Sequence, residues 1–252
     1  MNVSTDRLAE LTAALATMRV RLARAAEAAG RRSEEIKLLP VTKFFPATDV
    51  AILWRLGCRG FGESRSQEAV AKIAEFNTII DPSPDDRPVN WHMVGRLQRN
   101  KAKNVAAWAD TVHSVSTPKV IAALSEAVGE ALAEGRRSRP VRAFVQISLD
   151  GDTERGGVDI GDPAAVDRIC ALVADADGLE LVGLMAVAPL GADPDAAFAA
   201  LAEERSRVMR DHPGARELSA GMSGDLEAAV RHGSTCVRVG TALMGKRPLT
   251  SP

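Results

Sequence analysis

Residues 38–46 read LLPVTKFFP, an apolar run that ends on Lys43 and continues into a Phe-Phe-Pro turn. A run of this length and composition is typical of a strand that is covered on both faces, as in a parallel sheet. A helix-forming amphipathic stretch follows at 47–56, and a second β-rich run comes next at 58–63. This order of strand, helix and strand is the repeating unit of an α/β fold.

The same unit repeats along the rest of the chain. It predicts eight strands, at 38–43, 58–63, 90–95, 110–115, 141–148, 179–187, 216–220 and 235–241. It predicts helices at 47–56, 66–76, 98–108, 118–135, 163–176, 194–211 and 225–231, and one more at 5–29 before the first strand. We therefore expect a single-domain (β/α)8 TIM barrel over residues 1–252, in which the extra N-terminal helix takes the place of a short or missing eighth helix. A doubly wound open sheet is the alternative.

The bulk properties exclude several classes of protein. The formal net charge is −1 and charges of both signs are interspersed, which argues against binding to nucleic acid or to an anionic membrane surface. No run of 18 apolar residues occurs, and the first 30 residues are charged and helix-periodic rather than signal-like, so we expect a cytoplasmic protein. Cys58, Cys170 and Cys236 lack the spacing of a metal or redox site, so we expect reduced core residues and no metal.

In a barrel of this kind, chemistry belongs at the carboxyl ends of the strands. Lys43 ends the first predicted strand, so its amine would face the barrel mouth. Apolar neighbours there would favour the neutral amine that Schiff-base formation needs. The alternative is a strand-end lysine that extends into solvent.

A possible anion site follows the seventh predicted strand, where residues 217–229 read ELSAGMSGDLEAA. The sequence passes through a Gly-containing turn into a helix that begins near Ser223 or Asp225. Backbone amides of residues 222–224 would point at one spot, and the hydroxyls of Ser219 and Ser223 could add donors. The alternative is an ordinary helix cap formed by Ser223 or Asp225.

The eighth predicted strand lies in CVRVGTALMG, residues 236–245. Gly240 would let a ligand approach the backbone, and Thr241 could donate its amide and hydroxyl to the same anion. Strand alternation places Arg238 on one face with Cys236 and Gly240, so an inward Arg238 needs an acceptor within the barrel or at its mouth. An Arg238–carboxylate pair is the alternative.

These three segments follow strands one, seven and eight, which are neighbours once a barrel closes. An amine, a phosphate cradle and a cation beside a planar ring together indicate a site for pyridoxal 5′-phosphate (PLP).

A family resemblance points the same way. Residues 5–247 carry, in order, KFFP, GFGESRSQEA, WHMVGRLQRNKAKNV, HSVST, VQISLDGDTERGG, GLMAVAP, LSAGMSGDLEAAV and VRVGTALMGKR. By these motifs the chain resembles the pyridoxal phosphate homeostasis proteins, whose barrel is similar to the N-terminal domain of alanine racemase, a fold-type III PLP enzyme. The resemblance implies a role in vitamin B6 homeostasis without catalytic turnover, with PLP-dependent apoenzymes as candidate acceptors. It implies a Schiff base on Lys43, a phosphate site formed by Ser223, Gly240, Thr241 and the backbone of Met222, and an Arg238 that faces the pyridine nitrogen.

The rival hypothesis is a fold-type III racemase or decarboxylase, and a phosphate-binding barrel enzyme without PLP is a more distant one. The chain contains no Tyr, which the racemase uses as its second acid/base, and we expect no counterpart of the racemase's additional β-domain. Ser64 stands where the family usually has Asn, Arg96 where it often has His, and Arg155 where it often has Lys. Four other polar residues near strand ends are expected to pair with neighbouring groups: Glu63, Arg65, His92 and Lys101.

Overall fold

The computed structural model describes residues 5–83 and 86–246, in which strands and helices alternate. The strands are β1 (Lys37–Pro40), β2 (Gly60–Glu63), β3 (Asn90–Met93), β4 (Thr111–Val115), β5 (Val141–Ser148), β6 (Val158–Asp159), β7 (Leu179–Met185), β8 (Glu217–Ser219) and β9 (Cys236–Val239). The α-helices are α1 (Thr5–Ala28), α2 (Ala47–Arg55), α3 (Ser66–Ile79), α4 (Ala102–Ala106), α5 (Pro118–Ala133), α6 (Pro163–Ala174), α7 (Pro194–Val208), α8 (Leu226–Arg231) and α9 (Thr241–Met244).

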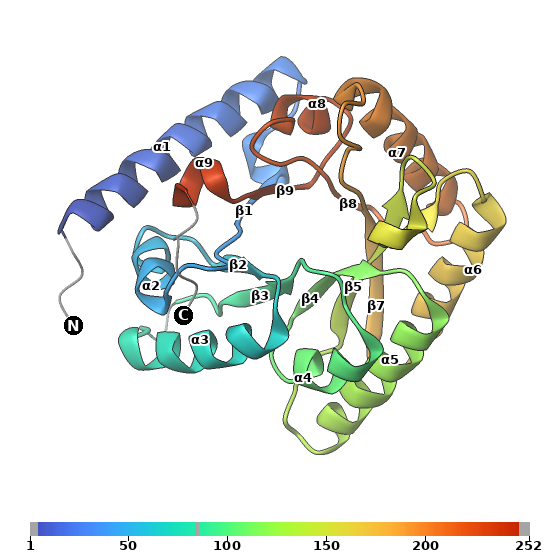
Figure 1. The fold of residues 1–252 in the computed structure, drawn as a ribbon, viewed down its shortest axis with the longest axis horizontal. Coiled ribbons are helices and arrows are strands. Elements are labelled where there is room, and N and C mark those ends of the chain that lie inside the picture. The colour runs from blue at the N-terminus through green and yellow to red at the C-terminus, as the bar shows by residue number, and fades with distance from the viewer. Residues whose placement is uncertain (1–4, 84–85, 247–252) are drawn as a thin grey trace.

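The sheet is parallel and closes on itself. Its strands follow the order β1-β9-β8-β7-β5-β4-β3-β2, with the short β6 paired to β5. A bridge between Val41 and Gly62 joins the two ends of this path, and the Thr42 amide donates to the Gly62 carbonyl at 2.9 Å. The helices form a ring around the strands (Figure 1). The predicted α/β TIM barrel is therefore confirmed, and the open doubly wound sheet is excluded.

Three of the helices begin at the prolines that the sequence marked as their starts. Each proline follows a Thr or Asp whose side chain accepts a hydrogen bond from the first turn, and the missing proline N–H falls where a helix has no intrahelical acceptor for it. The pairs are Thr117 with the Val120 amide in α5, Asp162 with the Ala165 amide in α6, and Asp193 with the Asp195 amide in α7.

Other boundaries differ from the sequence prediction. The first strand was expected to reach Lys43, but β1 ends at Pro40 and only the bridge at Val41 extends it. The last strand was expected to reach Thr241, but Thr241 begins α9. The helix expected at 98–108 is a 3-10 turn, Arg99–Lys101, followed by the short α4. Neither β6 nor α9 was predicted, because two to four residues are too few to show a periodicity.

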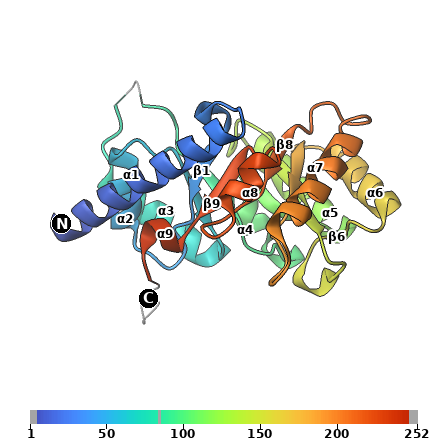
Figure 2. The same cartoon turned by 90° about the horizontal axis from the view of Figure 1, so that it is seen from above.

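Helix α1 lies on the outside of the barrel and packs against α2, α8 and α9 (Figures 1 and 2). It buries Leu11, Leu15, Met18 and Leu22, which the 3.6-residue period places on one face. This agrees with the expectation that the extra helix covers the side where the final helix is short. No helix in residues 5–83 or 86–246 is long and apolar enough to cross a bilayer.

Two hydrophobic clusters are separate. The large one packs the helices against the outer face of the sheet, and the small one consists of Phe144, Val182 and Met185. Of the cysteines, Cys170 and Cys236 are buried and Cys58 is half-buried, and all three are free thiols, as expected.

Candidate cofactor site

The carboxyl ends of β1, β8 and β9 meet at one side of the barrel mouth. The Val41 amide donates to the Val239 carbonyl at 2.8 Å, and the Arg238 amide donates to the Gly221 carbonyl at 2.9 Å. A Cβ added at Gly240 would lie 3.9 Å from the Val41 carbonyl oxygen. The three segments singled out in the sequence are thus adjacent, as barrel closure requires.

Lys43 lies in the turn between β1 and α2, and its side chain is exposed. Its Nζ is 5.8 Å from the ring centroid of Phe44, whose backbone has a left-handed φ of 70°. A bulky residue at such a φ is strained, and strain of this kind gathers at functional turns. The expectation that apolar neighbours would cover the amine is wrong. Strand β1 ends before Lys43, so the lysine lies in the turn and its side chain is exposed.

A buried polar cluster supports the backbone next to Lys43. The Thr42 hydroxyl donates to Glu63 Oε1 at 2.6 Å, and Lys72 Nζ lies 2.7 Å from the same oxygen and donates to the Thr42 carbonyl at 2.9 Å. Burial raises the pKa of Glu63, and the Lys72 ammonium and the Thr42 hydroxyl oppose that rise. Sequence reasoning missed Lys72, although its spacing of three from the buried Ala69 on α3 was a usable signal.

The loop between β8 and α8 departs in part from the prediction. The Met222 amide donates to Asp225 Oδ1 at 2.6 Å, and the helix begins at Leu226, with Asp225 as its N-cap residue. Ser219 was expected to offer its hydroxyl to an anion here. It is instead fully buried within the barrel, where it contacts other polar groups.

The loops after β8 and β9 contact each other and present free donors. The Ala242 amide donates to Ser223 Oγ at 3.4 Å, and the Thr241 side chain is exposed. Within the described residues, the backbone amides of Ser223, Gly224 and Thr241 have no hydrogen-bond acceptor. A Cβ at Gly224 would meet nothing within 4 Å, so packing within the protein does not explain the absence of a side chain there.

Arg238 is buried in the barrel and donates its hydrogen bonds to neutral acceptors. Its Nη1 donates to the Ser219 carbonyl at 2.7 Å and to Ser219 Oγ at 2.6 Å, and its Nη2 donates to the Ala186 carbonyl at 2.9 Å. Burial lowers the pKa of this guanidinium. Arg238 thus points inward, as alternation predicted, and its contacts are with carbonyls and a hydroxyl rather than with a carboxylate.

Two histidines extend this network across the barrel. His113 Nδ1 lies 2.8 Å from Ser219 Oγ, and His113 Nε2 lies 2.9 Å from His92 Nδ1. Since Arg238 can only donate, Ser219 accepts from it and has its own hydrogen for His113. His92 Nε2 is then the last atom of this hydrogen-bond network, and it is buried without a partner among the described residues.

Burial lowers the pKa of His92 and of His113 well below the ordinary value of 6.5. The neighbouring positive charges act in the same direction, Lys37 and Arg142 on His92, and Arg238, Lys37 and Arg142 on His113. Both rings are therefore neutral at pH 7.

The remaining sequence candidates are paired or lie apart from the three loops. Glu63, Arg65 and His92 pair with neighbours, as expected, Arg65 with Glu68 at 2.6 Å. Arg96 donates to the Glu154 carbonyl at 2.7 Å, and Arg155 pairs with Asp150 and Asp152. The Ser64 carbonyl lies so close to Gly95 that a Cβ there would be 2.2 Å from it. No cluster of metal-binding side chains occurs in the described part of the chain.

Comparisons with known proteins agree with this architecture. Residues 14–248 match the family described as "Alanine racemase, N-terminal domain". A "Pyridoxal phosphate homeostasis protein" from Mycobacterium tuberculosis (strain H37Rv) is 62% identical over 249 residues, which are 98% of this chain and 96% of that protein. The structure of PipY from Synechococcus elongatus with PLP bound has a TM-score of 0.76 at 31% identity, covering 93% of this chain and 100% of the other.

An alanine racemase from Bartonella henselae shares the fold at 17% identity, with a TM-score of 0.63 over 95% of this chain and 61% of the racemase chain. From the matched family and the extent of these identities, the chain belongs to the alanine racemase N-terminal domain family and, within it, to the pyridoxal phosphate homeostasis proteins.

Proposed function

We propose that this protein binds PLP at the barrel mouth and serves intracellular PLP homeostasis in the cytoplasm. One observation carries the proposal: an exposed lysine amine stands beside two loops in which the amides of Ser223, Gly224 and Thr241 have no acceptor in the described chain. The printed names of its relatives, and the PLP bound to PipY, support the same assignment.

The residues present fit the phosphate group of PLP. The amides of Ser223, Gly224 and Thr241 and the hydroxyls of Ser223 and Thr241 are donors on adjoining loops, and donors to an anion form strong hydrogen bonds. Gly240 leaves room on the β1 side, since a Cβ there would touch only Val41. The Met222 amide joins this set if it exchanges Asp225 for the phosphate.

When bound, PLP supplies an aldehyde that condenses with an amine and a conjugated ring that withdraws electrons. Lys43 provides the amine. In the proposed site Arg238 would face the pyridine nitrogen, where its permanent positive charge would disfavour protonation of the ring. The hydrogen bonds of Arg238 to Ser219 and Ala186 hold that charge in place.

The role we assign is to hold and release PLP rather than to catalyse a reaction. The chain has no Tyr to act as a second acid/base opposite Lys43. The exposed position of Lys43 leaves a bound aldehyde within reach of an acceptor, for which PLP-dependent apoenzymes are our candidates.

A visible absorbance spectrum of the purified protein with PLP, before and after borohydride reduction, tests the proposal. We expect a Schiff-base band that reduction removes, and a reduced adduct that peptide mass mapping locates at Lys43. A spectrum of free PLP alone would overturn the proposal and favour a phosphate-binding barrel that does not use PLP.

A further inference from the structure

The N-terminal helix α1 contacts the candidate phosphate loop through one arginine. Arg21 donates from Nη1 to the Ser223 carbonyl at 2.7 Å. Its Nε and Nη2 donate to the two carboxylate oxygens of Glu227 at 2.5 and 2.6 Å. A bidentate pair fixes the plane of a guanidinium, so the third donor is held toward Ser223.

The loop that Arg21 contacts has few other supports. Within the described chain, its flanks are tied by the bond from the Arg238 amide to the Gly221 carbonyl and by the bonds between Met222 and Asp225, and Ser223 itself has only the long contact from the Ala242 amide to its Oγ. The Gly221 backbone is in the left-handed region, with φ at 90°, and Gly224 has open space around it. The Ser223 carbonyl shares its peptide plane with the Gly224 N–H, so the Arg21 contact sets the direction of the Gly224 amide.

Helix α1 also fastens the loop after β9. Arg7 donates to the Met244 carbonyl at 2.9 Å, at the end of α9, and to Asp49 Oδ2 at 2.7 and 3.1 Å. Its guanidinium carbon lies 5.6 Å from the ring centroid of Phe45, two residues after Lys43. One helix thus contacts all three segments of the candidate site from outside the barrel.

We propose that Arg21 is a positioning residue for phosphate recognition. It acts through the Ser223 carbonyl to orient the donors of the loop after β8, and this inference rests on the proposed PLP function. The N-terminal helix is then part of the cofactor site, because without it the barrel would have the phosphate donors but not their fixed arrangement.

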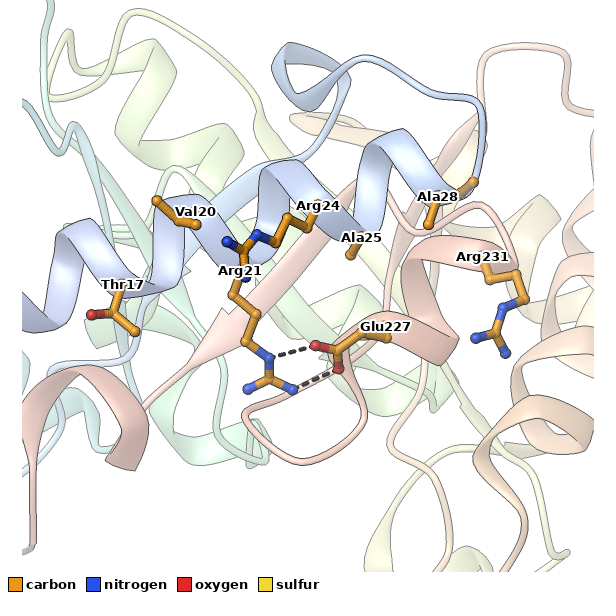
Figure 3. Close-up of a pocket in the computed structure, with 9 residues that line it drawn as sticks. Thr17, Val20, Arg21, Arg24, Ala25, Ala28, Glu227 and Arg231 are labelled. Carbon is orange, nitrogen blue, oxygen red and sulfur yellow. Dashed lines mark hydrogen bonds and ion pairs between the residues drawn. The ribbon is translucent and has the colours of Figure 1, made fainter.

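The surroundings of Arg21 make this contact accessible from the surface. Arg21 lines an open groove of about 570 Å³ between α1 and α8, with Arg24, Ala25, Ala28 and Arg231 among its other residues (Figure 3). Figure 3 shows the Arg21 side chain reaching from α1 to Glu227. Arg21 can therefore be replaced without opening the hydrophobic core.

The chain offers a matched control in Arg19. It is on the same helix and also donates to a backbone carbonyl, that of Leu56 at 2.9 Å. Leu56 follows α2 and precedes β2, so it lies at the amino ends of the strands, away from the mouth. Two residues along a helix correspond to a turn of about 200°, so the two arginines reach opposite sides.

The test compares the dissociation constants of PLP and pyridoxal for wild type, Arg21→Met, Arg21→Lys and Arg19→Met, each with a thermal unfolding curve. For Arg21→Met we expect the PLP constant to rise about five- to tenfold, the scale of one hydrogen bond. The pyridoxal constant should stay within about twofold, since pyridoxal has no phosphate. Arg19→Met should leave both constants unchanged, and Arg21→Lys should fall between wild type and Arg21→Met.

Equal weakening of PLP and pyridoxal, or the same loss in Arg19→Met, would overturn the positioning role. If Arg21→Met does not fold, the ratio of the two constants in Arg21→Lys decides by the same criterion. Pyridoxal trapped at Lys43 of the variants would keep the proposed function even if the Arg21 inference fails. A wild type that traps neither compound would remove both.

Discussion

His113 Nδ1 lies 2.8 Å from Ser219 Oγ, and this contact joins β4 to β8 across the interior of the barrel. These strands are not neighbours, since β5 and β7 lie between them in the sheet. The ring of His113 also stacks on Phe144, with centroids 4.6 Å apart. The interior of the barrel is therefore filled with side chains. A hydrogen-bond network from His92 to Arg238 lies beside the apolar cluster of Phe144, Val182 and Met185.

The buried histidines predict how stability depends on pH. Their pKa values are lowered in the folded state, so below about pH 6.5 the unfolded chain binds more protons than the folded one. The contribution of these histidines to the free energy of unfolding is therefore fully present above that pH. It decreases as the pH falls further, by up to about 1.4 kcal/mol per pH unit for each histidine.

Urea titrations between pH 5 and pH 8 measure this slope. His113→Asn should flatten it between pH 5 and 6.5, because one of the two lowered histidine pKa values is then absent. An unchanged slope in His113→Asn would show that this ring does not stay neutral in the folded protein.

Lys43→Ala should abolish the Schiff-base band and borohydride trapping, because the other amine near this turn, that of Lys72, is held in an ion pair with Glu63. The free energy of unfolding should change by no more than about 0.5 kcal/mol, since the side chain is exposed. Peptide mass mapping checks the site of any residual adduct. Lys101 and Lys103 are the first alternatives to inspect, and normal yield at either would contradict the assignment of Lys43.

The double variant Ser223→Ala, Thr241→Ala should weaken PLP more than pyridoxal. Each lost hydrogen bond to the charged phosphate is worth about 1.5–3 kcal/mol. Fluorescence or absorbance titration with both compounds measures the difference, and Ser206→Ala, a hydroxyl on α7 that bonds to the Ala202 carbonyl, is the control. If both affinities drop by one factor, the phosphate binds elsewhere.

Glu63→Ala should destabilise the fold by about 3 kcal/mol or more, because it leaves the Lys72 ammonium buried without its carboxylate. Lys72→Met in the Glu63→Ala background should recover part of that loss, since no unpaired charge then remains. Urea unfolding of the single and double variants checks this. A double variant less stable than Glu63→Ala would mean that Lys72 contributes mainly through Thr42.

Added L-alanine or L-serine should show negligible racemisation or transamination in the presence of PLP. The chain lacks a Tyr to serve as the opposing base, and in the proposed site Arg238 would weaken the ring as an electron sink. Alanine racemases have a similar barrel and are enzymes, so the barrel itself does not prevent turnover. The prediction therefore depends more on the missing Tyr than on Arg238. Chiral chromatography of the amino acid measures racemisation over many turnovers. Steady racemisation that Lys43→Ala abolishes would show that the protein is an enzyme.

The order of strands and helices was predictable because it depends on local patterns. The β-rich run 141–148 is β5 at the expected bounds, and the prolines after Thr117, Asp162 and Asp193 start their helices as expected. The adjacency of the Lys43, Ser223 and Thr241 loops followed from barrel closure, a general property of the fold.

Other features needed contacts between distant residues. Ser219 and Ser223 look alike in the sequence, yet Ser219 is turned into the lumen toward His113 and Arg238, while Ser223 stands in the loop. The place at which β1 stops is also set by its partners, because the Val41 amide makes the last bond to β9 and the Thr42 amide then bonds to Gly62 of β2.

The sequence by itself determined the α/β barrel, the candidate lysine and the two candidate phosphate loops, since periodicity, turn chemistry and helix caps act over a few residues. Only the tertiary structure decided that Lys43 is exposed, that Glu63 pairs with Lys72, and that Arg21 reaches Ser223 from 202 positions away. Burial and hydrogen bonding between such residues depend on how the helices pack around the closed sheet, and no local pattern in the chain records that arrangement.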